Sequence, residues 1–385
     1  MPELAKNSLI FALLYFSEGL EVSLTSVILP VFLIEKGIEK TAVGIIVALT
    51  ALPWSIKILW GFIVDKFAFF GRKKFILAGG ILASLMSFLL YFINPSFYLL
   101  IFCIVMFLTR VGVAFLDVSS DSLSISITKE NERGRVNSAM FVGQFAGIAV
   151  GSSILPFIAD KFSYPHSFLT VGFLILSIMP VIFLIKEKKL LSKEHLIKKL
   201  KQSFSKKTSL LVLFLAPLAS IPSGMLELLV PIFAKEKLEL DIIRIGYINI
   251  VYSILMVIGS FSGGAVSDRI GRKKAYFIFI ILSGISFSML YFSNNYTLLT
   301  ILWAVSGFFI GAKTSISCAM FMDFTEKRVG ATQFAVYTSA SNFGSSIGSA
   351  VSGIISNSIG FMSTFFISGI MLIPSLIILS KVNSN

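Results

Sequence analysis

Apolar stretches long enough to cross a bilayer follow one another along the whole chain. A membrane-spanning α-helix needs ~20 mostly apolar residues. Short turn-forming segments such as 94–96 (Asn-Pro-Ser) and 164–166 (Tyr-Pro-His) separate neighbouring stretches. The pattern predicts an all-α membrane protein. We place its twelve transmembrane helices at residues 8–34, 41–64, 75–93, 97–127, 136–159, 167–185, 208–234, 244–266, 275–293, 297–321, 331–356 and 361–380.

One long polar stretch, residues 186–207, separates the first six predicted helices from the last six. It holds nine lysines, and apolar residues recur between them at near-helical spacing. We expect an amphipathic helix that lies on the membrane surface and is attracted to anionic lipid; a calmodulin-like partner site is the alternative. The predicted organisation is an N-terminal six-helix bundle (1–185), a basic cytoplasmic linker (186–207) and a pseudo-symmetric C-terminal six-helix bundle (208–385).

Composition agrees with lipid as the solvent. Hydrophobic residues make up 56% of the 385 residues and charged residues only 14%, whereas a soluble domain carries about 25% charged residues. The first apolar stretch is too long for a cleaved signal peptide, so we interpret it as a spanning helix. The two cysteines and two histidines have no metal-ligand spacing. We therefore expect no enzyme activity, no catalytic residue, no metal and no cofactor.

The loops carry their Lys and Arg residues unevenly. With the N-terminus placed in the cytoplasm, the inside segments hold 24 of these residues and the outside loops hold 6. Because cytoplasmic loops are enriched in Lys and Arg, this distribution predicts a multi-pass protein of the cell (plasma) membrane with both termini cytoplasmic. It also accounts for the net charge of +13, so we expect no nucleic-acid partner.

The two predicted bundles repeat short motifs at an offset of 200 residues. Tyr-Phe-x-Asn at 91–94 recurs at 291–294, and Gly-Arg-Lys-Lys at 71–74 recurs at 271–274. Internal duplication of this kind is the architecture of many secondary transporters, whose solute site lies near the bilayer midplane between the repeats. Channels and receptors are built this way less often, so the repeat favours a transporter.

A longer motif includes the second copy of Gly-Arg-Lys-Lys. Residues 264–274 read Gly-x-x-x-Asp-Arg-x-Gly-Arg-Lys-Lys, which resembles the signature of the major facilitator superfamily residue for residue. Residues 61–74 hold a looser copy with three extra residues before the second glycine. The resemblance implies a twelve-helix transporter of that fold. It also implies an inner-gate latch of the outward-facing state, formed by Gly61, Asp65, Gly71, Arg72, Gly264, Asp268, Arg269, Gly271 and Arg272.

Glycines in several helices predict close packing, because small residues let membrane helices approach one another. We expect this of Gly61 and Gly264, while Asp65 and Asp268 face the positive N-terminal end of a neighbouring helix. Helix 5 lacks the Gly-Pro repeat of drug/proton antiporters, which weighs against an exporter. Gly-x-x-x-Gly spacing in helices 5 and 11 predicts faces where the two halves rock against each other, at Gly143, Gly147, Gly151, Gly344 and Gly348.

Eight ionisable residues lie inside predicted helices, where they are costly and usually mark function. Some share a helix face: Glu18 and Glu21 are one turn apart, and Arg110 is 7 residues before Asp117 and 11 before Asp121. In the resembling superfamily helices 1, 4, 7 and 10 line the central cavity, which implies that seven of the eight lie there. For those nearer the cytoplasmic ends, latch or snorkelling roles are the alternative. The eight residues are Glu18, Glu21, Lys57, Arg110, Asp117, Asp121, Glu227 and Lys313.

The first half also resembles a narrower group, the AmpG-type muropeptide permeases and the related acetyl-coenzyme A transporters. The chain departs from that group at Leu116, where Gln is usual, at Glu18 and Glu21, which replace uncharged residues, and in lacking a Trp shortly after Asp121. The resemblance therefore does not transfer a substrate. The resembling pieces are Gly19-Leu20, Leu24-Thr25-Ser26, Lys57-x-Leu59-Trp60, the insertion before Gly71, Asp117-x-x-x-Asp121 and Glu132-Arg133-Gly134.

These observations predict a monomeric secondary transporter that moves a small, anionic solute by alternating access, by symport with a proton or a sodium ion. Cationic side chains would bind the solute, and buried carboxyl groups would take up the proton because burial favours their protonated form. The substrate-binding candidates are Arg110, Lys313, Glu18, Glu227 and Lys57, and the proton-coupling candidates are Glu18, Glu21, Asp117 and Asp121.

Two alternatives remain open at this point. The first is an exporter of amphipathic cations driven by proton antiport, in which Glu18, Glu21 and Glu227 form an acidic binding site. The second is a membrane sensor that transports nothing. Competition by lipophilic cations rather than anions favours the exporter, and flux in liposomes separates either transporter from a sensor.

Overall fold

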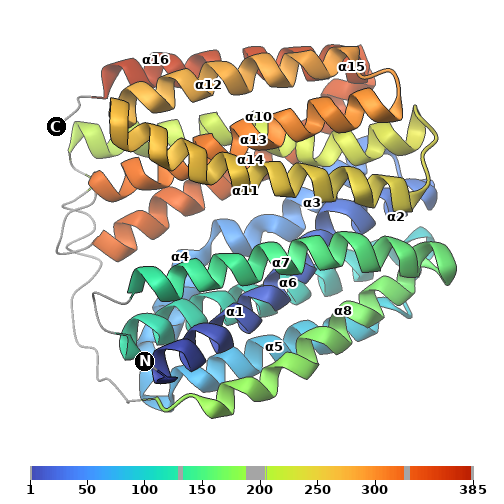
Figure 1. Ribbon diagram of the computed structural model, residues 1–385. Coiled ribbons are helices and arrows are strands. Elements are labelled where there is room, and N and C mark those ends of the chain that lie inside the picture. The colour runs from blue at the N-terminus through green and yellow to red at the C-terminus, as the bar shows by residue number, and fades with distance from the viewer. Residues whose placement is uncertain (1, 129–132, 188–203, 205, 325–329, 383–385) are drawn as a thin grey trace. The chain divides into compact units, whose positions relative to one another are not determined.

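The structure, a computed structural model, describes residues 2–128, 133–187, 204, 206–324 and 330–382 (Figure 1). These residues form helices and no strand. Eleven helices are long and apolar enough to cross a membrane. The other predicted span corresponds to α14 (Gly330–Ile359), a helix of 30 residues whose many serines, glycines and asparagines lower its hydropathy. The all-α membrane fold predicted from the sequence is confirmed.

The helices group into two compact units, Met1–Gly37 with Ile56–Lys193 (unit 1) and Ile38–Ser55 with Glu194–Asn385 (unit 2). Unit 1 contains α1 (Pro2–Ser23), the π-helical turn η1 (Leu24–Ile28), α2 (Leu29–Glu35), α4 (Lys57–Lys66), the 3-10 turn η2 (Ala68–Phe70), α5 (Arg72–Leu90), α6 (Pro95–Ile127), α7 (Arg133–Lys161), α8 (Tyr164–Ile178) and the 3-10 turn η4 (Met179–Leu184).

Unit 2 consists of helices from the second half of the chain and one from the first. They are α3 (Lys40–Ser55), α10 (Lys207–Glu236), α11 (Ile242–Ile270), α12 (Arg272–Met289), the 3-10 turn η5 (Leu290–Phe292), α13 (Tyr296–Asp323), α14, α15 (Phe361–Ile370) and α16 (Ile373–Lys381).

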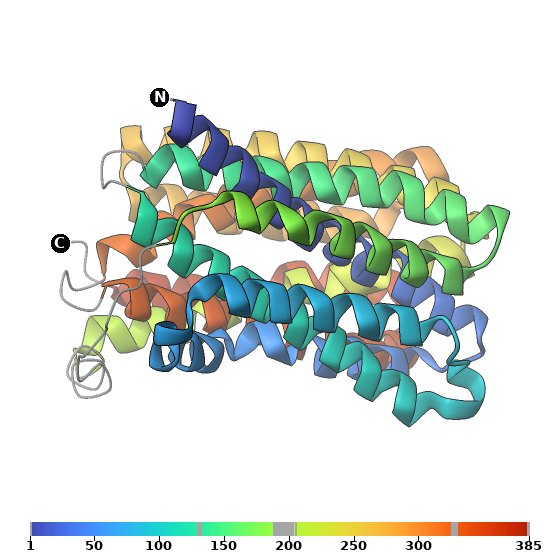
Figure 2. The same cartoon turned by 90° about the horizontal axis from the view of Figure 1, so that it is seen from below.

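Both units pack their helices in the same pattern. In unit 1, α1 lies along α7 and α4 lies against α6; in unit 2, α10 lies along α14 and α11 lies along α13 (Figures 1 and 2). The first helix of each repeat therefore packs on the fifth, and the second packs on the fourth. This correspondence is what an internal duplication of six helices requires.

Glycines permit the closest of these contacts. A Cβ atom added at Gly143 or Gly147 of α7 would collide with backbone carbonyl oxygens of α1. A Cβ atom at Gly344 or Gly348 of α14 would collide in the same way with α10. The close-packing faces predicted from the Gly-x-x-x-Gly spacing are present. These glycines pack within their own unit, and the expectation that the two halves rock against each other there stays a prediction.

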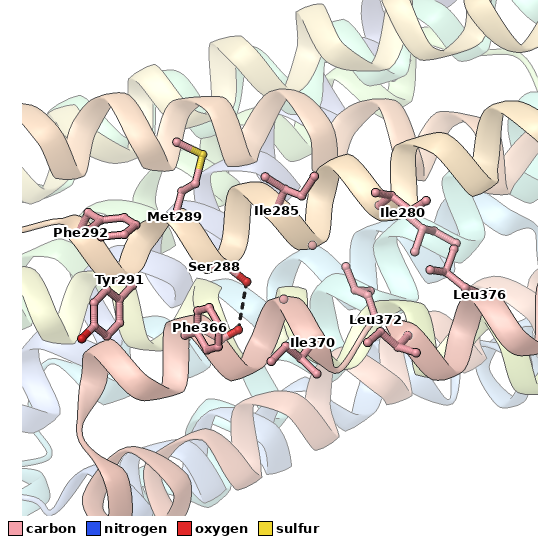
Figure 3. A pocket seen from close by; sticks show the side chains of 14 residues that line it. Ile280, Ile285, Ser288, Met289, Tyr291, Phe292, Phe366, Ile370, Leu372 and Leu376 are labelled. Atoms are coloured by element: carbon pink, nitrogen blue, oxygen red, sulfur yellow. Dashed lines mark hydrogen bonds between the residues drawn. The ribbon is translucent and has the colours of Figure 1, made fainter.

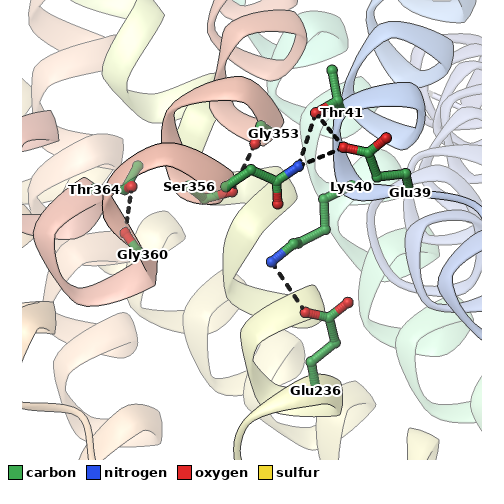
Figure 4. Close-up of polar contacts among 9 residues, drawn as sticks. Glu39, Lys40, Thr41, Glu236, Gly353, Ser356, Gly360 and Thr364 are labelled. Carbon is green, nitrogen blue, oxygen red and sulfur yellow. Dashed lines mark hydrogen bonds and ion pairs between the residues drawn. The ribbon is translucent and has the colours of Figure 1, made fainter.

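The second predicted helix, 41–64, is divided. Pro53 lies inside α3, where it removes a backbone hydrogen bond and favours a kink, and a single residue separates α3 from α4. The N-terminal end of α3 is held in unit 2 by polar contacts (Figure 4). Lys40 pairs with Glu236 of α10 at 3.5 Å, and Asn357 of α14 donates a hydrogen bond to Glu39 at 2.7 Å.

The predicted basic linker, 186–207, falls largely outside the residues that the structure describes, since 188–203 and 205 are not among them. The amphipathic surface helix and the division of the chain at this linker therefore stay predictions. At its two ends, Glu187 is described as part of unit 1, and α10 begins at Lys207.

Candidate functional site

Six of the eight intramembrane ionisable residues lie in unit 1. Glu18 and Glu21 are on α1, Lys57 is the first residue of α4, and the other three follow one face of α6. Glu18 and Glu21 are fully buried. A charge inside a membrane bundle is costly unless a partner compensates it, so the contacts of these side chains decide what the site can do. The three residues on α6 are Arg110, Asp117 and Asp121.

Four of these residues and a tyrosine form what we call the charge cluster: Tyr15, Glu18, Lys57, Asp117 and Asp121. Lys57 and Asp117 form an ion pair in which their side chains are 22% and 3% exposed. Lys57 also interacts electrostatically with Glu18 and Asp121. Tyr15 donates its hydroxyl hydrogen to Asp121. The ammonium of Lys57 is thus paired inside the helix bundle.

Glu18 has the least complete hydrogen bonding in the charge cluster. Gln144 of α7 donates from Nε2 to Glu18 Oε2 at 3.3 Å. Glu18 Oε1 is buried and has no hydrogen-bond partner within the part of the chain that the structure describes. An ionised carboxylate in this position has one oxygen without a hydrogen-bond donor, which is costly when that oxygen is buried. The site therefore suits a group that gains a proton or meets a ligand.

Glu21 and Arg110 form a second, looser pair in unit 1. Arg110 Nε lies 3.7 Å from Glu21 Oε1, and the two side chains are 11% and 0% exposed. Strong Arg–carboxylate contacts are bidentate and have N···O distances of about 2.7–2.9 Å. Neither oxygen of Glu21 has a hydrogen-bond partner among the described residues. The pair compensates charge but leaves room for both groups to take a further partner.

Unit 2 contains the remaining two ionisable residues. Lys313 of α13 is 4% exposed, and its ammonium donates to the carbonyl oxygen of Ala219 at 2.6 Å and to Ser223 Oγ at 3.2 Å. Glu227 of α10 is exposed and accepts a hydrogen bond from Tyr252 at 3.3 Å. Glu227 and Lys313 interact electrostatically without forming an ion pair within 4.0 Å. Lys313 is thus a buried cation held by neutral oxygens.

The neutral polar partners of these charges were not predicted from the sequence. Tyr15 lies three residues before Glu18 on the same helix face, so helical spacing was a usable signal. Gln144 and Tyr252 lie on other helices than the carboxylates that they contact, and no local spacing connects them. Tyr252 is positioned by stacking on Trp303, with ring centroids 4.3 Å apart and an interplanar angle of 6°.

The repeated Gly-Arg-Lys-Lys motif begins a helix in both units. Gly71 and Gly271 have φ angles of 92° and 88°, which glycine adopts without steric cost, and α5 and α12 start at the next residue. In unit 2, Arg272 lies 2.7 Å from Asp323 and 4.0 Å from Asp268. The three extra residues of the looser copy form the 3-10 turn η2.

The close packing expected at the first glycine of each copy of this motif is not found. A Cβ atom at Gly61 or Gly264 would make ordinary contacts, at 3.7 Å and 3.5 Å, so neither glycine is a point of close helix approach. Close approach of α11 to α13 occurs instead at Gly259 and Gly263. Arg269 is exposed. The side chain of Asp65, predicted to face a helix N-terminus, lies outside what the structure describes.

An apolar groove of about 680 Å³ runs along unit 2 between α12, α15 and α16. Ile280, Phe366 and Leu376 are among its lining residues, and the Ser288 hydroxyl donates to the Phe366 carbonyl oxygen at 3.1 Å (Figure 3). None of the eight ionisable residues, all of which the structure describes, lines this groove. Its apolar lining suits lipid chains, and we do not assign the solute to it.

The sequence profile of the Major Facilitator Superfamily matches residues 11–241 and 212–383. The chain belongs to the Major Facilitator Superfamily. Membership explains the twelve helices, the duplicated units and the motif at 264–274, and it identifies the chain as a multi-pass membrane transporter rather than an enzyme.

Curated relatives agree with this family and with the resemblance to AmpG-type permeases, which is confirmed. The anhydromuropeptide permease of Escherichia coli (strain K12) is 24% identical over 395 residues, covering 97% of this chain and 79% of the permease. The proton-coupled antiporter flippase LtaA of Staphylococcus epidermidis (strain RP62A) is 25% identical over 353 residues, covering 86% of this chain and 84% of the flippase.

Solved structures share the fold. The D-xylose-proton symporter superposes with a TM-score of 0.77 at 13% identity, covering 99% of this chain and 97% of the symporter. A bacterial homologue of the human lysosomal transporter Spinster, inward-facing and unoccupied, gives a TM-score of 0.72 at 12% identity, with coverage of 98% and 94%. At these identities the likeness shows the major facilitator fold alone.

Proposed function

We propose that this major facilitator transporter moves a small anionic solute by alternating access, that a proton is the coupling ion, and that both termini are cytoplasmic. The proposal rests on the environment of the Lys313 side chain. Its ammonium is buried, and among the described residues it donates hydrogen bonds to neutral oxygens of Ala219 and Ser223. Glu227 interacts with this ammonium only from beyond ion-pair distance. Because a buried cation without a direct ionic partner is costly, a bound anion stabilises it more than a neutral solute does.

Arg110 supports the same solute class from unit 1. Its contact with Glu21, at 3.7 Å, is long for an Arg–carboxylate pair. An anionic solute that replaces or extends this contact gains a charge-assisted hydrogen bond. Lys57 contributes less, because Asp117 already pairs with it. We therefore assign solute recognition to Lys313 and Arg110 and treat Lys57 as part of the coupling machinery.

Glu18 is our candidate for the coupling proton. Its Oε1 atom is buried without a hydrogen-bond partner among the described residues, and Asp117 and Asp121 add like charge nearby. Protonation removes that repulsion, and deprotonation is stabilised by Lys57. A proton-coupled antiporter flippase among the relatives supports the choice of ion.

The test uses the full chain in liposomes that enclose a pH-sensitive dye. Anhydromuropeptides, small organic acids and lipophilic cations are added one at a time across an imposed pH gradient. We expect a carboxylate-bearing solute to drive proton movement. Lys313→Gln should raise the solute concentration that gives half-maximal transport at least tenfold, which corresponds to about 1.4 kcal/mol. The control Lys313→Arg keeps the charge, and its half-saturating concentration should be closer to that of the unmodified chain. Glu18→Gln should retain solute exchange and lose solute-driven proton movement.

A second candidate function rests on a separate observation. Four of the six intramembrane ionisable residues of unit 1 are carboxylic acids and two are cations, so an amphipathic cation bound at Glu18 also improves the charge balance. This describes proton-coupled export of cations. Proton movement driven only by lipophilic cations, and unchanged in Lys313→Gln, would contradict the anionic solute and support the exporter. No flux with any solute would contradict both.

A further inference from the structure

The two copies of Gly-Arg-Lys-Lys have the same backbone but different surroundings. Gly71 has φ 92° and ψ 134°, and Gly271 has φ 88° and ψ 143°. Each glycine is followed directly by the first residue of a long helix, α5 or α12, whose first backbone N–H groups have no partner inside the helix. The two helix ends therefore offer the same donors, and any difference between them lies in what accepts from these donors.

In unit 1 the acceptor is a carboxylate of the chain itself. Glu187, just after η4, accepts hydrogen bonds from the backbone N–H of Arg72 at 2.6 Å and of Lys73 at 3.3 Å. A Cβ atom at Gly71 would lie 3.0 Å from Glu187 Oε2, so the missing side chain makes room for the carboxylate. Gly71 is consequently buried. The motif in this unit is an occupied anion site at a helix N-terminus.

In unit 2 none of the residues that the structure describes takes the place of Glu187. A Cβ atom at Gly271 would meet nothing within 4 Å, and Gly271 is exposed. A pocket of about 850 Å³ opens there. Its polar side is formed by the motif, Gly271 to Lys274, and its apolar side by Phe277, Met320 and Phe324. Among the described residues, therefore, nothing in unit 2 fills the space that the carboxylate of Glu187 fills in unit 1.

The charges around this pocket favour an anion. Among the described residues, Arg272, Lys273 and Lys274 line it together with one carboxylate, Asp323, which is paired with Arg272 Nε at 2.7 Å. Lys273 donates to the carbonyl oxygens of Ser380 at 3.1 Å and of Val382 at 2.6 Å, which fixes the far wall of the pocket. The positive end of the α12 dipole adds to the same field.

The position of the pocket indicates which anion. Arg272 is the first residue of a candidate membrane span, Arg272–Phe292, so the pocket lies at the boundary where phospholipid headgroups meet water. One side is basic and the other apolar, which matches a molecule that carries both a phosphate and a hydrocarbon part. We propose that this pocket binds the phosphate of an anionic membrane phospholipid, in the place that the Glu187 carboxylate takes in unit 1.

Binding to the full chain in a neutral maltoside detergent tests the proposal. Isothermal titration with dioctanoyl phosphatidylglycerol should give one site, and dioctanoyl phosphatidylcholine should bind at least tenfold more weakly. Inorganic phosphate is the third ligand, because it offers the same oxyanion without the hydrocarbon. Binding of phosphatidylglycerol alone identifies a lipid site. Binding of phosphate equal to that of phosphatidylglycerol overturns the lipid assignment and leaves a site for small anions.

Two variants test the assignment from opposite directions. Ser380→Glu places a carboxylate in the wall of the pocket and should abolish binding, whereas the uncharged control Ser380→Gln should keep it. Glu187→Ala empties the equivalent position in unit 1 and should raise the number of phosphatidylglycerol sites from one to two. Absence of binding in the unmodified chain, or binding that persists in Ser380→Glu, overturns the proposal even if Glu187→Ala does not fold.

Discussion

Replacing Lys57 by Met, or Asp117 by Asn, removes one partner of the ion pair in the charge cluster. Breaking a buried pair from one side costs about 3–5 kcal/mol. The two halves of this pair are not equivalent, because Lys57 also interacts with Glu18 and Asp121. Without Asp117, Lys57 keeps two acidic neighbours. Without Lys57, three carboxyl groups remain together and no cation of the cluster compensates them.

The expected order of stability follows from this asymmetry. Asp117→Asn should lose about 3 kcal/mol, at the low end of the range because Lys57 keeps 22% exposure and other partners. Lys57→Met should lose about 5 kcal/mol at pH 7.5. The double variant should be more stable than Lys57→Met alone, because it removes one of the three crowded carboxylates. The deficit of Lys57→Met should shrink as the pH falls, since protonation removes the like charges; that of Asp117→Asn should not.

Chemical unfolding of the purified chain in mixed micelles, at pH 7.5 and 5.5, measures these free energies. Equal losses for the two single variants would show that Lys57 acts on Asp117 alone. A double variant as unstable as the sum of the two singles would refute the idea that the pair acts as a unit. Either result would remove the physical basis for placing Lys57 in a coupled cluster.

Two further predictions concern packing and hydrogen bonding. Gly147→Leu should prevent folding or cost several kcal/mol of stability, because the new side chain would overlap the carbonyl of Phe16. Gly264→Ala should be nearly neutral, because its Cβ atom makes an ordinary contact at 3.5 Å. Fluorescence-detected size exclusion of the two variants checks this order, and the reverse order contradicts it. Tyr15→Phe should cost about 1–3 kcal/mol of stability because it removes the hydrogen-bond donor to Asp121. Thermal unfolding measures this loss, with Tyr291→Phe as the control at an exposed position. Equal effects of the two substitutions would contradict the prediction.

The sequence was sufficient for the helices and for the candidate residues, because both have local signals. Apolar length identifies a span whatever packs against it, and helical spacing placed Arg110, Asp117 and Asp121 on one face of α6. The break between α3 and α4 also has a local cause in Pro53. Among the predicted spans, α14 alone corresponds to a helix whose mean hydropathy is below that of the eleven candidate membrane spans.

The contacts between helices could not be predicted in the same way. Hydrophobic periodicity shows which residues share a helix face, but not which other helix packs against that face. The glycines of helices 5 and 11 were identified as close-packing positions, yet their partners are α1 and α10 of their own units. Lys57 is separated from Asp117 by a whole helical hairpin in the sequence, and Gln144 is farther still from Glu18. The hydrogen bond from the Arg72 N–H to Glu187 joins the start of α5 to the residue after η4, and no sequence motif connects these two positions.

The two units share their helix packing but differ in their buried charges. This difference determines which ligand, a proton or an anion, lowers the cost of burying charge in each unit. Unit 1 surrounds Lys57 with three carboxyl groups and gives Arg110 a fourth, so protonation improves its charge balance. Unit 2 buries Lys313 against neutral oxygens, with Glu227 beyond ion-pair distance, so a bound anion gives this cation a direct ionic partner. Under the proposed function, a proton and an anionic solute each reduce the cost of burying charge in a different unit. A chain loaded with both therefore carries fewer uncompensated charges than one loaded with either, which is the energetic condition for moving the two together.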